Sequence, residues 1–106
     1  MLVAQMYVLF FNSLNAASGY SADLVTSVTF KFDENVYYIG FFEPVDEITE
    51  YQFDEKYLVN IKFPSIDCDF IKQYDHKWKD NPILEIVMGK KVIGTGELKN
   101  WEFKPT

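Results

Sequence analysis

Residues 83–98 read ILEIVMGKKVIGTGEL, and this stretch decides the fold class. Two segments with strand character flank Gly89-Lys90, and a glycine at the first position of a two-residue loop is typical of a type II′ turn. Gly94 and Gly96 interrupt the second segment. Because they lack a Cβ, they permit a bulge or the close approach of a neighbouring backbone. The stretch therefore predicts a β-hairpin whose second strand bends.

Further strand patterns extend outward from this hairpin over most of the chain. Apolar residues alternate in segments 2–11, 24–32, 36–42 and 57–63. Pro44 and Pro64 end the last two of these strands, since proline cannot donate to a ladder. Gly40, in mid-strand, suggests a bulge or a sharp bend at a barrel corner. Residues 12–21 form a turn-rich loop, and residues 45–56 are irregular with a short strand at 51–53.

The one helical turn that we expect lies near residues 69–74, followed by a polar loop that contains Trp78. We expect Trp78 to cover an open end of the barrel, because a large amphipathic ring suits that position. The pattern predicts an all-β fold, a small closed antiparallel β-barrel of six or seven strands with at most one short helical turn. Residues 1–106 are expected to form a single domain, which matches the length of one hydrophobic core.

The first residues resemble a signal peptide only in part. The apolar run lacks a preceding lysine or arginine, covers about ten residues and contains Gln5. With a period of two, even positions from 2 to 10 form one apolar face, which predicts the first barrel strand. One cysteine, Cys68, excludes an internal disulfide and indicates either a reducing compartment or a protein indifferent to redox state. Because no apolar run approaches the length of a membrane span, we expect a cytoplasmic protein.

Charge is distributed unevenly along the chain. The formal net charge is -6, all ten basic residues are lysine, and residues 1–63 carry nine acidic residues and three lysines. Nucleic-acid partners are not expected, because phosphate recognition relies on basic surfaces and on bidentate arginine. The acidic residues of the densest run are Glu43, Asp46, Glu47, Glu50, Asp54 and Glu55.

Three stretches together resemble the C-terminal β-barrel of elongation factor Tu. They are Gly19-Tyr20 before a strand, LVNIKFPSID at residues 58–67, and the final hairpin, where Gly89, Val92, Gly94 and Gly96 match. The resemblance implies the barrel fold and the binding of a macromolecule. The hairpin turn here lacks arginine, a Pro-Gly turn before the central strand is missing, and the chain has no GxxxxGK[ST] loop, so GTP hydrolysis does not carry over.

Catalytic and metal-binding patterns are weak. Cys68 and His76 are the only thiol and imidazole, and no nucleophile motif surrounds them. Asp67, Asp69 and Asp75 precede His76 at a spacing that matches no specific metal site. The carboxylates of residues 43–55 lack the residues that shape a sugar site around a glycosidase pair. We therefore predict no enzyme activity, no metal and no cofactor.

The sequence is most consistent with a non-catalytic protein-binding β-barrel that docks a basic partner. A narrower hypothesis is an immunity or inhibitor protein that neutralises a toxin. The alternative is a translation- or tRNA-associated module, as the resemblance to elongation factor Tu barrels implies. The oligomeric state is left open. The expected binding residues are the six acidic residues of the run, together with Tyr37, Tyr38 and Tyr51. We expect these three tyrosines to be exposed, and tyrosine is enriched at protein interfaces.

Overall fold

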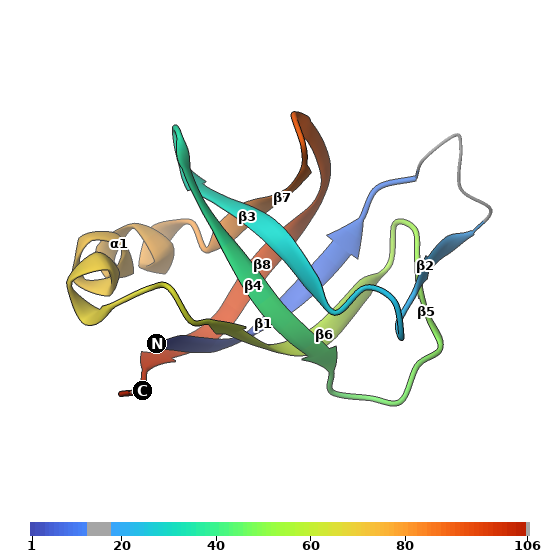
Figure 1. Cartoon of the computed structure of the whole chain (residues 1–106), viewed down its shortest axis with the longest axis horizontal. Coiled ribbons are helices and arrows are strands. Elements are labelled where there is room, and N and C mark those ends of the chain that lie inside the picture. Colours follow the sequence, from blue (N-terminus) through green and yellow to red (C-terminus); the bar gives the residue numbers. More distant parts are fainter. Residues whose placement is uncertain (13–17, 106) are drawn as a thin grey trace.

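A computed structural model describes residues 1–12 and 18–105, and six of its strands close into an antiparallel barrel (Figure 1). Neighbouring strands follow the order β1-β6-β4-β3-β7-β8, and β8 pairs again with β1. The predicted fold class is confirmed. The elements are β1 (Leu2–Phe10), β2 (Gly19–Ser21), β3 (Ser27–Asp33), β4 (Val36–Pro44), β5 (Glu50–Gln52), β6 (Lys56–Phe63), α1 (Cys68–Asp80), β7 (Ile83–Met88) and β8 (Lys91–Phe103).

β1 shows how the period-two pattern becomes a barrel wall. Its even-numbered residues from Leu2 to Phe10 are buried, while the odd-numbered residues are partly exposed. It pairs with β6 on one side and with β8 on the other. Burial of one large aliphatic side chain contributes roughly 1.5–3 kcal/mol, so these residues form part of the central core. The predicted loop at 12–21 includes residues 13–17, which lie outside the described residues, and it ends in β2.

Two additions close the open ends of the barrel, and Figure 1 shows α1 at one end and the ribbon of β2 and β5 at the other. At the ribbon end, the ring of Phe10 meets Tyr20 and Tyr51 edge-to-face, with centroids 5.2 and 5.6 Å apart. At the helix end, Trp78 packs against Phe32 from the barrel at 5.8 Å. Aromatic rings fill these wide ends because each one buries a large area.

The helix is longer than the single turn expected near residues 69–74. It runs over Cys68–Asp80, so Trp78 lies in the helix and not in a polar loop. A side-chain oxygen of Asp67 accepts the Phe70 N–H at 3.0 Å and caps the first turn. The signal that reveals the extra length is the spacing of four between Phe70, Tyr74 and Trp78, which places three rings on one helix face. Trp78 is 1% exposed and covers the barrel end, as predicted.

Gly89 and Gly94 of the final hairpin behave as their positions predict, whereas Gly96 lies under the side chains of Met6 and Phe30 and not against a backbone. Gly89 has a φ of 63° in a two-residue turn between Met88 and Lys91. Gly94 lies against β1 so closely that a Cβ would overlap the carbonyl oxygen of Leu9. The β7–β8 register also shifts between Ile86 and Val87, beside this contact. Both the close backbone approach and the bulge are therefore present.

Gly40 has a different role from the predicted bulge. The irregularity between β3 and β4 lies between Lys31 and Asp33, away from Gly40. A Cβ at Gly40 would lie 2.7 Å from side-chain atoms of Ile61 and Phe63. The glycine is thus required because large side chains of the core occupy the space above it, and the expected bulge at this residue is wrong.

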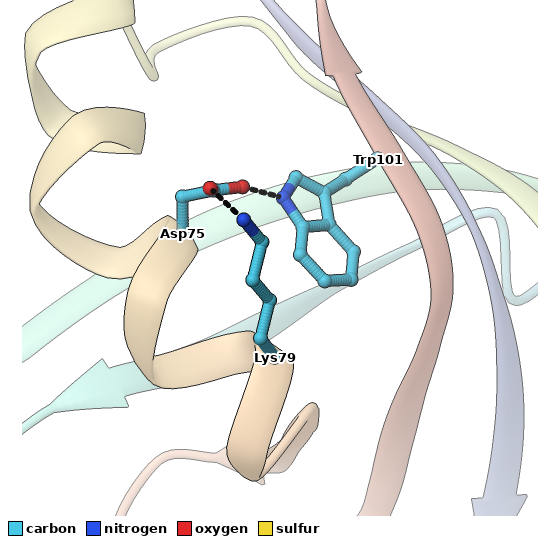
Figure 2. Close-up of polar contacts among 3 residues, drawn as sticks. All are labelled: Asp75, Lys79 and Trp101. Carbon is cyan, nitrogen blue, oxygen red and sulfur yellow. Dashed lines mark hydrogen bonds and ion pairs between the residues drawn. The ribbon is translucent and has the colours of Figure 1, made fainter.

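A polar contact fastens α1 to β8 (Figure 2). The indole N–H of Trp101 donates to Asp75 Oδ1 at 2.6 Å, and Lys79 Nζ lies 3.4 Å from Asp75 Oδ2. The hydrogen bond from Trp101, followed by Lys79, lowers the pKa of Asp75 from its usual value of 3.8. The ionised carboxylate therefore stabilises the docked helix.

The contact predicts a pH-dependent contribution to stability. Because the pKa of Asp75 is lower in the folded state, its contribution is present above about pH 4 and is lost as pH falls through the lowered pKa. We expect Asp75→Asn to be less stable than the wild type at about pH 7, and the difference to shrink below about pH 3. Urea unfolding, monitored by circular dichroism at both pH values, measures the free energy of unfolding of the two proteins. A difference that stays constant between them would contradict the prediction.

Candidate protein-binding surface

Most of the acidic run lines one hollow beside the β2–β5 ribbon. The hollow has a volume of about 830 Å³, is open to solvent, and is bordered by the loop that follows β4 and by residues of β5 and β6. We call it the acidic hollow. No lysine lines it. Its carboxylates are those of Asp23, Asp46, Glu47, Glu50 and Glu55.

The structure separates the predicted acidic residues into two groups. Four of the six line the acidic hollow, whereas Glu43 lies in a smaller depression with Asn60 and Lys62. Asp54 is exposed and turns the chain between β5 and β6, with a φ of 62° and its N–H donating to the Phe10 carbonyl at 2.7 Å. Asp23 was not predicted. It reaches the hollow because the Ala22 N–H donates to the Thr49 carbonyl at 3.0 Å.

Local hydrogen bonds orient part of the hollow. The Tyr57 hydroxyl donates to Glu55 Oε2 at 3.2 Å and accepts the Gln52 N–H at 3.0 Å. Burial raises the pKa of Tyr57, which keeps the hydroxyl a donor to Glu55. Ser18 donates to Glu50 in the same way. These hydrogen bonds hold Glu50 and Glu55 in place at the hollow.

No lysine neutralises these carboxylates by a direct ion pair. Within residues 1–12 and 18–105, the ion pairs join Lys79 to Asp75 and Lys104 to Glu102, and neither involves the acidic hollow. The exposed charges therefore create a field of one sign, which extends about a Debye length, roughly 8 Å at physiological salt. Such a field attracts cationic surfaces and repels anionic ones.

The three predicted binding tyrosines differ in exposure. Tyr37 is exposed, Tyr38 is half-buried against Phe70, and Tyr51 is fully buried. The expectation that Tyr51 is exposed is wrong. Alternation along β5 directs Glu50 and Gln52 to the hollow and turns Tyr51 into the barrel, where its hydroxyl has no partner among the described residues. Burial raises the pKa of Tyr51 to about 12.

The thiol and the imidazole considered for catalysis do not converge. Cys68 and His76 are both exposed and stand eight residues apart on α1, a rise of about 12 Å along the helix axis. The Cys68 thiol is exposed because it lies in the first residue of α1. Among the described residues, no group of three or more His, Cys, Asp or Glu side chains is placed to hold a metal ion.

Exposed apolar side chains are the surface feature that the pattern-based prediction missed. Beyond the predicted Tyr37, Ile39 and Phe41 lie exposed on the same outer face of β4, and Leu24 is 84% exposed in the turn before β3. The outward stripe on β4 could have been found from its sequence, VYYIGFF, which is apolar on both faces. The exposure of Leu24 could not, because it depends on how the β2–β5 ribbon meets the barrel.

The fold and surface together define a class: a small closed antiparallel β-barrel, capped at both ends, with an acidic hollow beside one cap. No family model matched the chain, and neither the curated proteins nor the solved structures compared with it gave a match. The resemblance to the C-terminal barrel of elongation factor Tu stays a prediction. Among the described residues, no helix combines the length and apolar character needed to cross a membrane.

Proposed function

We propose that this protein is a non-catalytic protein-binding β-barrel whose acidic hollow docks a basic surface of another protein. The observation that carries the proposal is the convergence of five carboxylates on one open hollow, with no lysine among the described residues of its lining. A rigid barrel supports this surface, so little ordering is required on binding. Complementary charge accelerates association and selects against acidic partners.

The narrower form of the proposal is an immunity or inhibitor protein that neutralises a basic toxin. A nuclease is the best-suited target, because enzymes that bind the phosphate backbone present clustered lysine and arginine side chains. An acidic hollow offers such a surface several carboxylates at once. The net charge of -6 adds long-range attraction to these local contacts.

Neutralising the hollow tests the proposal. The variant Asp46→Asn, Glu47→Gln, Glu50→Gln, Glu55→Gln removes four charges and keeps similar side-chain shapes. With a panel of purified basic nucleases as probes, we expect affinity for a bound nuclease to fall roughly 10- to 100-fold, since exposed ion pairs contribute about 0.2–1 kcal/mol each. Isothermal titration calorimetry at low and high salt measures this affinity.

The matched control removes four charges outside the hollow. Glu34→Gln, Asp69→Asn, Asp80→Asn and Glu85→Gln change exposed residues of the β3–β4 turn, α1 and β7. This variant should bind within about threefold of the wild type, because charges beyond a Debye length are screened. Equal losses in both variants, or an affinity that does not change with salt, would reject docking in the hollow. Salt-sensitive binding of tRNA would instead favour the translation-associated alternative.

A further inference from the structure

An apolar groove opens at the mouth of the barrel, at the same end as the β2–β5 ribbon. It has a volume of about 240 Å³. Drug-sized ligands occupy about 300–1,000 Å³, so this groove is of the size for a single side chain. We call it the mouth groove. The residues that form most of its lining are Tyr20, Leu24, Val25, Val28, Met88 and Ile93.

The mouth groove exists because the pairing between β3 and β7 is short. β3 and β7 pair over three positions, and the last pair toward the mouth joins Thr29 to Val87. The next pair would join Val28 to Met88, but β7 ends there and the chain turns at Gly89. Val28 and Met88 therefore border an opening beyond the last paired residues of β3 and β7.

The apolar rim is held in a defined position. Leu24 is 84% exposed and Met88 is 61% exposed. The turn that carries Leu24 is closed by two backbone hydrogen bonds to the Ser21 carbonyl, from the Leu24 N–H at 3.2 Å and the Val25 N–H at 3.0 Å. Because the backbone is fixed, Leu24 presents its side chain to solvent beside the groove. Fixed, exposed apolar groups next to a cavity are typical of interface anchors.

The mouth groove and the acidic hollow adjoin. Asp23 lines the hollow, and the next residue, Leu24, lines the groove. We infer that the partner docks through a segment with an apolar side chain flanked by lysine or arginine. The apolar side chain enters the mouth groove, and the flanking cations face the acidic hollow. This inference rests on the proposed function and adds the chemistry of the docking segment.

Two synthetic lysine-rich peptides of equal length and charge test the inference. One carries a central leucine and the other a serine at that position. Titrated into the full chain at low salt, the leucine peptide should bind roughly tenfold more tightly. It should shift the backbone NMR signals of Leu24, Val28 and Met88 as well as those of the hollow. The serine peptide should shift only the signals of the hollow.

Two substitutions test whether the difference in affinity between the two peptides arises at the mouth groove. Leu24→Ser should abolish the preference for the leucine peptide and leave the affinity for the serine peptide unchanged. The side chain of Leu24 is almost entirely exposed, so the fold does not depend on it. Ile83→Ser is the matched control, because Ile83 is 50% exposed at the opposite end of β7 from Met88. This variant should keep the preference.

The outcomes separate the two proposals. If both peptides bind with equal affinity, or Leu24→Ser retains the preference, the mouth groove is not the apolar site and the inference is overturned, while docking in the hollow stands. If neither peptide binds at low salt, both proposals fail. If Leu24→Ser instead changes the sedimentation coefficient of the chain alone, the groove belongs to a second copy, and the inference is overturned.

Discussion

Trp78→Ala is expected to destabilise the protein by about 3–5 kcal/mol, the range for removing a large aromatic side chain from a core. The ring is 1% exposed and contacts Phe32 of the barrel, Tyr74 of α1 and Trp101 of β8, with centroids 5.6–6.1 Å away. Its removal would leave a cavity between the helix and the barrel end. For a domain of this size the midpoint of thermal unfolding should fall by roughly 15 °C or more.

Trp78→Phe distinguishes the effect of a smaller side chain from the effect of losing the polar indole N–H. The Trp78 indole N–H is buried and has no hydrogen-bond partner among the described residues. Phenylalanine removes this unsatisfied donor, which offsets part of the lost packing, so we expect destabilisation below about 2 kcal/mol. Thermal and urea unfolding followed by far-ultraviolet circular dichroism would measure both variants. Equal losses for alanine and phenylalanine would show that the ring does not fill the barrel end as described.

Gly94→Ala is expected to destabilise by about 2–4 kcal/mol, although it adds a single methyl group. That methyl would overlap the carbonyl oxygen of Leu9 and approach the Phe10 Cα to 3.1 Å. A flexible side chain could move aside, but here the neighbour is the backbone of β1. The two strands would have to separate at a central seam of the barrel.

Gly89→Asn is the control variant for Gly94→Ala. Gly89 has a φ of 63°, and a Cβ there meets no atom within 4 Å. Asparagine tolerates the left-handed region better than other non-glycine residues, so the cost should stay below about 1 kcal/mol. Urea denaturation of both variants gives the two free energies of unfolding. A Gly94→Ala variant as stable as Gly89→Asn would contradict the close approach of β8 to β1.

Most of the strands could be predicted from local patterns in the sequence. The buried even positions of β1 were predictable, because one face of the strand is consistently apolar and the side-chain period in a strand is two. The turn at Gly89 was predictable because its conformation favours glycine. Helix α1 was underestimated, since its many charged residues masked the three rings spaced by four at Phe70, Tyr74 and Trp78.

The candidate site was predictable only in part. The acidic run was visible, but the sequence does not show that Asp23 joins Glu50 and Glu55, because they are brought together by ribbon pairing across about thirty residues. Tyr51 was misplaced for a related reason. β5 is three residues long, and so short a pattern does not indicate which face is buried until the strand packs against Phe10 and Phe42.

The sequence by itself determined the all-β class, the hairpin turn at Gly89 and the concentration of negative charge in the first part of the chain. These depend on side-chain alternation, local backbone preference and composition, which are properties of short segments. Only the tertiary structure decided which acidic residues share a hollow, where a seam opens beside Leu24, and which tyrosine is buried. Those outcomes depend on pairing between strands far apart in the chain, and local patterns carry little information about such contacts.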